Sequence, residues 1–516
     1  MLLKGGGIRM HKRIICVILA SVMLLSLFGC SKNKVGVFTE ETQNGVSNHG
    51  TPIKDKEDST EDVKTEEQSS EAIVEDKIEN AFIKTEENEI STVSLSPEKA
   101  SYYYFRSLVN KNYTLDQLKM CSYGFKVEEF LNYFDGSDFD NKLDETFYVN
   151  TSLIDCPWNE ETKLFKLTLA AADSTLEQDN NFVFCIDVSE SMARDNVLPL
   201  FKSVFPYFLE KLGENDKVSV IACSDVINVV VDGAGVEDAD DILLAVESLE
   251  IGNGANANTD FSQVYGTAEK HFIKDGNNRV VFVSDGDMSG KLVDLIEENT
   301  ENDIFTSIIG LGDSNYKNEK LGTLAGAGRG RYYYIDCESS GERIMGDIIF
   351  RPIVCVAQNL ASALRFNSDR VEEYRLIGYV QSGEATGEGD AEDKPRNIYA
   401  GDVVTLVYEL KFIEFSKLSK LDFASVTVMY DESDRDYGRM VEFTVFTNEY
   451  IDKPKDDIKF LVSVMESVML LQSSEFIGEV TFDDIISDLE GMDLEEYPER
   501  AEFRELLKKI VNGVIQ

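Results

Sequence analysis

Short apolar runs alternate with amphipathic segments through the middle of the chain, over residues 179–350. The runs that predict strands are FVFCID, KVSVIAC, INVVV, RVVFVSD, IFTSIIGLG and RYYYID. The segments VLPLFKSVFPYFLEKL, ADDILLAVESL and FSQVYGTAEKHF repeat their apolar residues at the spacing of a helix. Strands that alternate with helices predict an α/β domain with a mostly parallel, doubly wound, Rossmann-like sheet.

The segments on either side of this domain have other patterns. Residues 351–450 contain runs such as DVVTLVYELKF and FASVTVMYD, which predict an antiparallel, sandwich-like β-module. Residues 451–516 predict a helical region, in which FLVSVMESVMLLQ is apolar enough to be buried. Residues 91–178 predict an N-terminal module, and we expect its tyrosines, Tyr102 to Tyr104, to pack at a junction between modules.

The N-terminus has the pattern of an export signal. Two basic residues precede an apolar run that ends at Gly29-Cys30, which is short for a membrane span and typical of a signal peptide over residues 1–30. The end of this run, LFGC, resembles a lipobox. The resemblance implies cleavage before Cys30, lipidation of its thiol and attachment to the extracytoplasmic face of the cell membrane; the alternative is an ordinary transmembrane anchor. Residues 31–90 contain 16 acidic and 7 basic residues, which predicts a disordered acidic tether.

The charge of the chain narrows the range of partners. There are 50 Lys and Arg residues against 95 Asp and Glu residues, a formal net charge of −45. Such a surface repels nucleic acid and anionic lipid headgroups, and it tolerates cations. The eight cysteines include no Cys-x-x-Cys pair, so neither a zinc ribbon nor a redox motif is predicted.

Acidic and hydroxyl side chains follow two of the predicted strands. Asp187 ends FVFCID, and Ser189 and Ser191 follow it at alternate positions; Asp285 ends RVVFVSD. In a parallel sheet, ligands bind beyond the carboxyl ends of the strands. Carboxylate and hydroxyl oxygens suit a hard divalent ion, above all Mg²⁺, while the absence of His and Cys from these loops argues against zinc. The sequence therefore predicts a Mg²⁺ site at this edge.

The same residues resemble a known family. Asp-x-Ser-x-Ser, formed by Asp187, Ser189 and Ser191, together with Asp285 in VSDGD, resembles the metal-ion-dependent adhesion site of the von Willebrand factor type A (VWA) domain. The blocks VEEFLNYF, CPWN, AEKHFIKDGNNRVVFVSDGD and FNSDRVEEYRLIGY are similar to the YfbK-like group of bacterial VWA lipoproteins. The resemblance implies a non-enzymatic surface protein with bound Mg²⁺, Mn²⁺ or Ca²⁺. It also implies a protein partner whose acidic side chain completes the coordination.

Two positions depart from the family pattern. Glu190 stands where the family usually has glycine, and its charge would either strengthen cation binding or fill the ligand position from within. The family's threonine ligand has two candidate positions. An ungapped alignment on AEKHF places Ala255 there, whereas Thr259 fits the T-D-x-x-x-A-L form of other VWA domains and is the residue we expect to bind the ion.

Other interpretations remain open. The DVSES stretch would cap a helix if it had no further role, because Asp and Ser are favoured N-caps. A serine hydrolase would need a base near Ser189 or Ser191, and the folded region offers only His271, within a predicted helix. A solute-binding lipoprotein would have two similar α/β lobes, and the pattern predicts one. The main alternative is a metal-independent scaffold with a degenerate VWA site.

Overall fold

The computed structural model describes residues 10–11 and 79–512, apart from 136–140, 174–177, 253–258, 287–291, 313–314, 317–318, 347, 352, 380–396, 433–436 and 495–496. Cys30, nearly all of the predicted signal peptide and residues 31–78 of the predicted tether lie outside the described residues. Across the described ranges, none of the helices combines the length and the apolar character that a membrane span requires.

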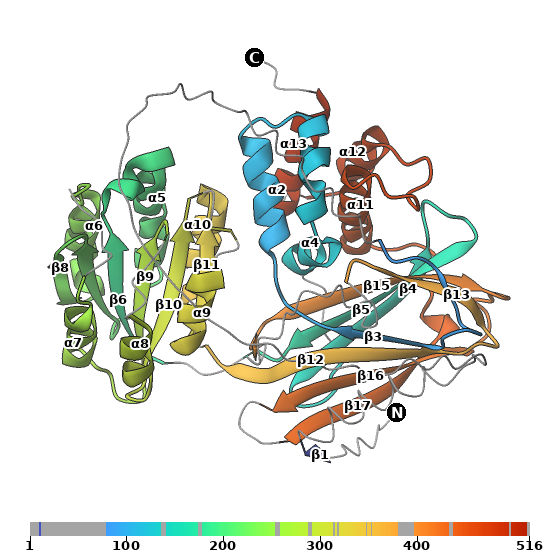
Figure 1. Ribbon diagram of the computed structural model, residues 1–516, viewed down its shortest axis with the longest axis horizontal. Coiled ribbons are helices and arrows are strands. Elements are labelled where there is room, and N and C mark those ends of the chain that lie inside the picture. Colours follow the sequence, from blue (N-terminus) through green and yellow to red (C-terminus); the bar gives the residue numbers. More distant parts are fainter. Residues whose placement is uncertain are drawn as a thin grey trace, which may run out of the picture. The chain divides into compact units, whose positions relative to one another are not determined.

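Six strands form the sheet of the α/β domain, in the order β11-β10-β9-β6-β7-β8 (Figure 1). Each neighbouring pair is parallel except β7 and β8. The chain begins at the centre with β6, runs outward to β8 and then crosses to β9, on the other side of β6. The strands are β6 (Asn180–Asp187), β7 (Lys217–Cys223), β8 (Ile227–Ala234), β9 (Asn277–Ser284), β10 (Ile304–Leu311) and β11 (Arg329–Ile335). The helices are α5 (Val197–Leu209), α6 (Ala239–Glu247), α7 (Ser262–Lys270), α8 (Leu292–Thr300), α9 (Glu319–Ala327) and α10 (Glu338–Gly346).

Helices cover both faces of this sheet because its strands are apolar on both sides. Phe182, Phe184 and Ile186 of β6 belong to a core shared with α5, α6 and α10. Val183 and Cys185, which alternate with them, belong to a second core shared with α7, α8 and α9. Successive side chains of a strand point to opposite faces, so a continuous apolar run is what a doubly covered strand requires. The predicted doubly wound α/β fold is confirmed.

The β-rich part is a sandwich of two antiparallel sheets with one core. One sheet has the order β2-β13-β15-β5-β4, and the other has the order β1-β17-β16-β12-β14, with β3 paired to β12. Strands that precede and follow the α/β domain are neighbours, as in β5 with β15 and β3 with β12. The predicted N-terminal module thus contributes strands to the same sandwich as residues 351–450. The strands are β1 (Met10–His11), β2 (Ile83–Lys84), β3 (Ile90–Ser94), β4 (Phe147–Asp155), β5 (Thr162–Ala171), β12 (Cys355–Phe366), β13 (Val371–Ile377), β14 (Asn397–Tyr399), β15 (Val403–Phe412), β16 (Asp422–Glu432) and β17 (Tyr437–Phe446).

The remaining helices form a bundle that also draws on both ends of the chain. Helices α2, α3 and α4 share one hydrophobic core with α11, α12 and α13, and Figure 1 shows α2, α4, α11 and α13 side by side. The helical C-terminal region is confirmed. The helices are α2 (Ala100–Asn110), α3 (Leu115–Cys121), α4 (Val127–Phe134), α11 (Asp456–Leu471), α12 (Phe482–Glu490) and α13 (Pro498–Asn512).

One turn holds both points at which the chain enters and leaves the α/β domain. The amide of Gly401 donates to the carbonyl of Ala171 at 3.2 Å, and the amide of Ala400 donates to the carbonyl of Val354 at 2.9 Å. Gly401 has a φ of +76°, and a Cβ atom there would lie 2.7 Å from Oδ1 of Asp173. Glycine meets both constraints because it has no Cβ. The α/β domain is therefore an insertion fixed at its two ends.

Residues 79–90, which the sequence assigned to the tether, have defined contacts in the fold. The side-chain amide of Asn80 donates to three carbonyl oxygens at and just after the end of β13, at 2.8 to 3.1 Å. Glu79 pairs with Arg375 at 3.3 Å, and β2 pairs with β13. The expectation that the disordered tether extends to residue 90 is therefore wrong for residues 79–90. Polar composition does not prevent order when the polar groups find hydrogen-bond partners in the fold.

The CPWN stretch surrounds a buried carboxylate. Glu409 on β15 accepts hydrogen bonds from Trp158 Nε1 at 3.3 Å, Asn159 Nδ2 at 3.3 Å and Thr162 Oγ1 at 2.8 Å. Arg375 pairs with the same carboxylate at 2.7 Å, and the side chains of both are 1 % exposed. A buried charge is tolerated when it is paired and hydrogen-bonded. The CPWN stretch and the start of β5 are thus anchored to β15 and β13.

Arg106 of α2 joins the helical bundle to the α/β domain. Its guanidinium donates to both oxygens of Asp336, from Nε at 2.9 Å and from Nη2 at 2.6 Å. A third bond runs from Nη1 to Glu502 on α13 at 3.0 Å. Two parallel hydrogen bonds from one guanidinium to one carboxylate fix both the distance between the two groups and their relative orientation. Three segments far apart in the sequence therefore meet at one side chain.

Tyr103 and Tyr104 of α2 pack at the same junction, as predicted, whereas Tyr102 lies in the core of the bundle. The ring of Tyr103 meets the ring of Tyr334 edge-on, with centroids 5.4 Å apart. The ring of Tyr104 stacks on Tyr316 with centroids 4.6 Å apart. Tyr334 lies on β11, and Tyr316 lies in the loop after β10, so α2 contacts two neighbouring segments of the α/β domain.

We predict that Arg106→Met destabilises the protein by about 3–5 kcal/mol, because Asp336 would be left as an unpaired buried carboxylate. The Asp336 side chain is 4 % exposed. Thermal unfolding of Arg106→Met, Asp336→Asn and the double variant forms the test. The double variant should lose less free energy of unfolding than the sum of the losses of the two single variants, by about 1 kcal/mol or more. Strictly additive losses would contradict an energetic link between the two side chains.

Glu466 of α11 predicts a pH dependence of stability. Burial raises the pKa of its carboxyl from 4.5 to about 8, and the charges of Asp488 and Asp484 add to the rise. The folded protein thus keeps a proton that the unfolded chain loses, so stability falls as the pH rises from about 4.5 to about 8.

Glu466→Gln should remove this effect, because the amide does not ionise. We expect its melting temperature to exceed that of the unchanged protein at about pH 8.5 and to match it at about pH 5. Glu475→Gln, at an exposed position, is the control. A gain of the same size at both pH values would show that the carboxyl of Glu466 does not titrate in this window.

Candidate metal centre

The two predicted acids come from adjacent strands. Asp187 is the last residue of β6, and Asp285 directly follows β9. These strands pair in parallel with Ile186 opposite Val283, so their carboxyl ends lie at one edge of the sheet. They also flank the point where the chain changes direction across the sheet, between β6 and β9, which is where doubly wound sheets open a binding crevice. The topology therefore brings Asp187 and Asp285 to one place.

The loop after β6 is held tightly against the sheet. The amide of Val188 donates to the carbonyl of Cys223 at 2.8 Å. The amide of Ser189 donates to Oδ1 of Asp187 at 2.8 Å, and the hydroxyl of Ser284 donates to Oδ2 of Asp187 at 3.0 Å. Asp187 and Ser189 are each 5 % exposed. The Asp187 carboxylate is thus fixed by its own loop and by the neighbouring strand.

Three hydroxyl and carboxylate groups converge beyond this loop. Oγ of Ser191 lies 3.0 Å from Oγ of Ser189 and donates to Oδ1 of Asp285 at 2.7 Å. Ser189 precedes a short 3₁₀ helix (Glu190–Asn196), yet its side chain makes no capping hydrogen bond to that helix. Its hydroxyl is directed to Ser191 instead. The helix-cap interpretation of the two serines is therefore not supported by their contacts.

Thr259 is the threonine expected from the sequence to bind the ion, and its hydroxyl has a contact outside this group. Oγ1 of Thr259 donates to the carbonyl of Ser224 at 2.6 Å. Earlier in the same segment, the amide of Gly252 donates to the carbonyl of Val188 at 2.7 Å. Ala255 lies outside the described residues. The choice between Thr259 and Ala255 for the threonine position thus stays a prediction.

Two residues near the site were not found from the sequence. Asn315 follows β10, and its side-chain amide donates to the carbonyls of Asp285 and Leu311. Arg194 lies in the 3₁₀ helix after β6, with Nη2 at 3.9 Å from Oδ2 of Asp285. The signal for Asn315 was the sequence LGDSN directly after a strand that neighbours β9. Arg194 had no signal, because its approach to Asp285 depends on how the 3₁₀ helix turns.

The electrostatics of the site favour a cation. The pKa of Asp285 is raised, chiefly by burial and also by the negative charge of Asp187. The hydrogen bond from Ser191 and the positive charge of Arg194 act in the opposite direction and lower this pKa. Two acids at one edge repel each other and would gain from a positive ion between them. Glu190 is exposed, and no hydrogen bond or ion pair of its side chain occurs among the described residues. Its side chain therefore gives no support to a site filled from within.

The donor set fits a hard ion. The side-chain oxygens of Asp187, Ser189, Ser191 and Asp285 are the ligand types that Mg²⁺ and Ca²⁺ take. Three or more His, Cys, Asp or Glu side chains do not gather into a metal-binding group anywhere in the described ranges, which leaves a site of two carboxylates completed by hydroxyls. The six cysteines in the described part are free.

Base-assisted chemistry at the serines finds no support. His271 directly follows α7 rather than lying within the helix as expected. Its Nε2 atom is 2.7 Å from Oδ1 of Asp232 on β8. Asp232 lies near the end of β8 that pairs with the start of β7, away from the carboxyl edge. Among the described residues, this histidine is therefore not placed to activate Ser189 or Ser191.

Comparison with family models divides the chain into three matched segments. Residues 181–346 match the von Willebrand factor type A domain. Residues 352–512 match the model described as uncharacterized protein YfbK, C-terminal, and residues 68–166 match a model described as von Willebrand factor.

Individual proteins are similar over different lengths. Uncharacterized protein YfbK of Escherichia coli (strain K12) is 27 % identical over 476 residues, which cover 84 % of this chain and 80 % of that protein. A von Willebrand factor type A structure from Catenulispora acidiphila is 14 % identical, with a TM-score of 0.32, over 73 % of this chain and 91 % of that one. BatB from Bacteroides thetaiotaomicron is 17 % identical, with a TM-score of 0.28, over 33 % of this chain and 96 % of that one.

The family matches agree with the sheet order and with the acids at its carboxyl edge. VWA domains are in general interaction modules rather than enzymes, so the matches place the chain among adhesion or assembly proteins. The chain thus contains a VWA domain, over residues 181–346, and is similar to the YfbK-like group over most of its length.

Proposed function

We propose that the VWA domain binds a protein partner through a divalent ion, Mg²⁺ first and Mn²⁺ or Ca²⁺ in its place. The observation that carries the proposal is the position of the Ser191 hydroxyl, 3.0 Å from Ser189 and 2.7 Å from Asp285. Asp187, Ser189, Ser191 and Thr259 would hold the ion, with Asp285 bound directly or through water. The ion would offer an open coordination position to an acidic side chain of the partner.

The charges explain why the ion would be needed. Without a cation, Asp187 and Asp285 present two negative charges at the edge where the partner's carboxylate must arrive, on a chain of formal charge −45. A third carboxylate would be repelled. A divalent ion neutralises the two acids and supplies the attraction, so the protein's own residues serve to hold and orient it. This makes partner binding dependent on the metal.

We predict that the full chain binds Mg²⁺ and Mn²⁺ in a calorimetric titration and that Asp187→Ala abolishes binding. Thr259→Val should weaken binding by about tenfold or more, because it removes one oxygen ligand. Asp238→Asn, an exposed acid between β8 and α6, is the control for loss of surface charge. No binding by the unchanged chain, or equal binding by Asp187→Ala, would overturn the metal proposal. Unchanged binding by Thr259→Val would remove Thr259 from the ligand set alone.

A metal-independent scaffold is the second candidate, and the contact of Thr259 favours it. The hydroxyl of Thr259 donates to the carbonyl of Ser224 rather than to a predicted ligand. Partner capture with and without a chelator separates the two functions. Retention of the partner in the chelator would support the scaffold.

We further propose that the chain is held at the extracytoplasmic face of the cell membrane by lipid on Cys30. The support is the lipobox-like LFGC sequence and the acidic segment that follows it. A lipid chain would keep the protein at the membrane while the polar segment holds the folded part away from it.

Cys30→Ser should move the protein from the membrane fraction to the soluble fraction of expressing cells, because no thiol remains for lipidation. Cys16→Ser, a cysteine within the predicted signal peptide, is the matched control and should stay with the membrane. Immunoblots of the two fractions give the measurement. A Cys30→Ser chain that remains in the membrane fraction would instead support the transmembrane anchor.

A further inference from the structure

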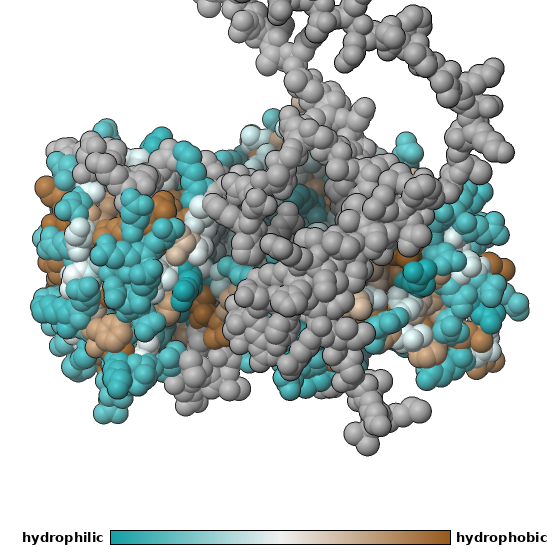
Figure 2. Space-filling view, turned by 60° about the horizontal axis from the view of Figure 1, so that its bottom comes forward, coloured by the Kyte–Doolittle hydropathy of each residue, from teal (hydrophilic) through white to brown (hydrophobic). Residues whose placement is uncertain are grey.

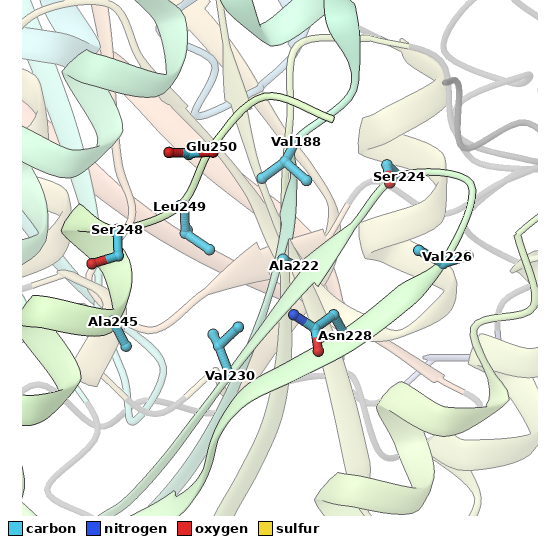
Figure 3. A pocket seen from close by; sticks show the side chains of 10 residues that line it. All are labelled: Val188, Ala222, Ser224, Val226, Asn228, Val230, Ala245, Ser248, Leu249 and Glu250. Carbon is cyan, nitrogen blue, oxygen red and sulfur yellow. The ribbon is translucent and has the colours of Figure 1, made fainter. Parts of the chain in front are cut away.

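A recess of about 410 Å³ opens beside the candidate metal centre. Figure 3 shows its walls: Val188 after β6, Ala222 on β7, Val230 on β8, and Ala245 and Leu249 at the end of α6. Most of these walls are apolar. The volume lies within the range of sites that hold small ligands or a large side chain. None of the candidate metal ligands is among the described residues that line this space.

The recess is continuous with the metal edge. Val188, which lines the recess, is the residue between Asp187 and Ser189. Its Cα atom therefore lies about 3.8 Å from the Cα atom of each of these two candidate ligands. Ser224 also lines the recess, and its carbonyl accepts the hydrogen bond from Thr259. Helix α6 ends at this edge. In the chain that follows it, the amide of Gly252 donates to the carbonyl of Val188. One extended segment of a partner could therefore reach both sites.

Exposed apolar side chains occur at one residue that lines the recess, Val226, and at two chain neighbours of lining residues, Leu244 and Ile251. Val226 in the β7–β8 turn is 64 % exposed, Leu244 on α6 is 61 % exposed and Ile251 after α6 is 37 % exposed. Figure 2 shows hydrophobic residues scattered among hydrophilic ones on its left-hand side, where the α/β domain lies. Exposed apolar side chains at the opening of a recess and next to polar residues are consistent with an interaction site.

The rim of the recess is acidic. Glu250 lines the recess and is exposed, and two further exposed acids, Asp225 and Glu247, directly adjoin lining residues in the chain. Lys202 lies nearby, but its ammonium donates to the carbonyls of Glu247 and Leu249 and so caps the end of α6. A partner side chain that enters here would bury apolar surface and meet negative charge at the rim. A neighbouring lysine or arginine on the partner fits this chemistry.

We propose that the recess is a specificity subsite for the partner protein. It receives one large apolar side chain, flanked by Lys or Arg, from the same segment that brings its carboxylate to the metal. This inference rests on the proposed metal-dependent binding for its place in the partner's segment, although the recess itself is metal-free. A second copy of this chain does not fit, because two acidic rims on chains of formal charge −45 repel each other.

The subsite can be tested without the metal by using two small probes. Benzylammonium combines an aromatic ring with a positive charge, and benzoate carries the same ring with a negative charge. Binding to the full chain is followed by saturation-transfer NMR in the presence of EDTA. We expect benzylammonium to bind at millimolar concentration and benzoate to bind at least about tenfold more weakly, because of the acidic rim.

Ala245→Trp fills the recess and should weaken benzylammonium binding by about tenfold or more. Asp240→Trp is the matched control, because Asp240 is exposed on the same helix and lies about 140° round its axis from Ala245. Equal binding to Ala245→Trp and to the unchanged chain would overturn the proposal. So would equal binding of the two probes, or no binding of benzylammonium.

Selection of displayed random peptides on the full chain in Mg²⁺ tests the link to the metal site. We expect an enriched motif with an acidic residue, a large apolar residue and a basic residue within one short segment. Selection on Ala245→Trp should lose the apolar position and keep the acid, whereas selection on Asp187→Ala should lose the acid and keep the apolar position. A motif with the acid alone overturns the subsite and leaves the metal-dependent function standing. A motif without the acid, unaffected by EDTA, overturns the metal-dependent function and leaves the subsite standing.

Discussion

The pairing of β5 with β15 is the constraint on which the rest of the molecule depends. These strands lie on opposite sides of the VWA domain in the sequence, and they register along nearly their whole length. Closing so long a loop loses chain entropy, and the shared core of the two sheets offsets that loss. The chain leaves the sandwich at the end of β5 and returns to it at β12 of the other sheet. The turn at Ala400 and Gly401 holds both points.

In the helical bundle, too, segments from before and after the VWA domain pack together, and the bundle also contacts that domain. Its helices come from both ends of the chain, and Arg106 joins α2 to α13 and to Asp336 after β11. The loop after β10 provides a second connection. Asn315 in this loop holds the carbonyl of Asp285, while the next residue, Tyr316, stacks on Tyr104 of α2. Adjacent residues of one loop therefore contact both the candidate metal centre and the bundle.

Charge gives the candidate binding edge its chemical character. The chain as a whole is strongly acidic, and two further acids lie where the sheet ends. A divalent ion would reverse the sign of the field at that point alone, while the rim of the neighbouring recess stays negative. An acidic side chain and a basic side chain on one partner would then find separate places a few residues apart. Such an arrangement favours selectivity, because a wrong partner meets repulsion at one place or the other.

The sequence by itself determined the α/β domain and the positions of its acids. Apolar runs such as FVFCID show that both faces of a strand are buried, and the first polar residue after each run marks the edge of the sheet. Asp187, Ser189, Ser191 and Asp285 could be found in this way because each is fixed by its distance from the end of a strand. The sequence also predicted the β-rich and helical regions, since both have a local period.

Only the tertiary structure decided how these regions combine. Strand pairing between segments far apart has no local signal, so the merging of residues 91–178 with residues 351–450 into one sandwich was invisible to periodicity. The order of residues 79–90 rests on partners such as Arg375, which the local composition does not reveal. The contacts of Arg194 and Asn315 with Asp285 and the recess under Val188 likewise arise between loops of different strands. Local sequence sets which element forms, whereas long-range packing sets which side chains meet.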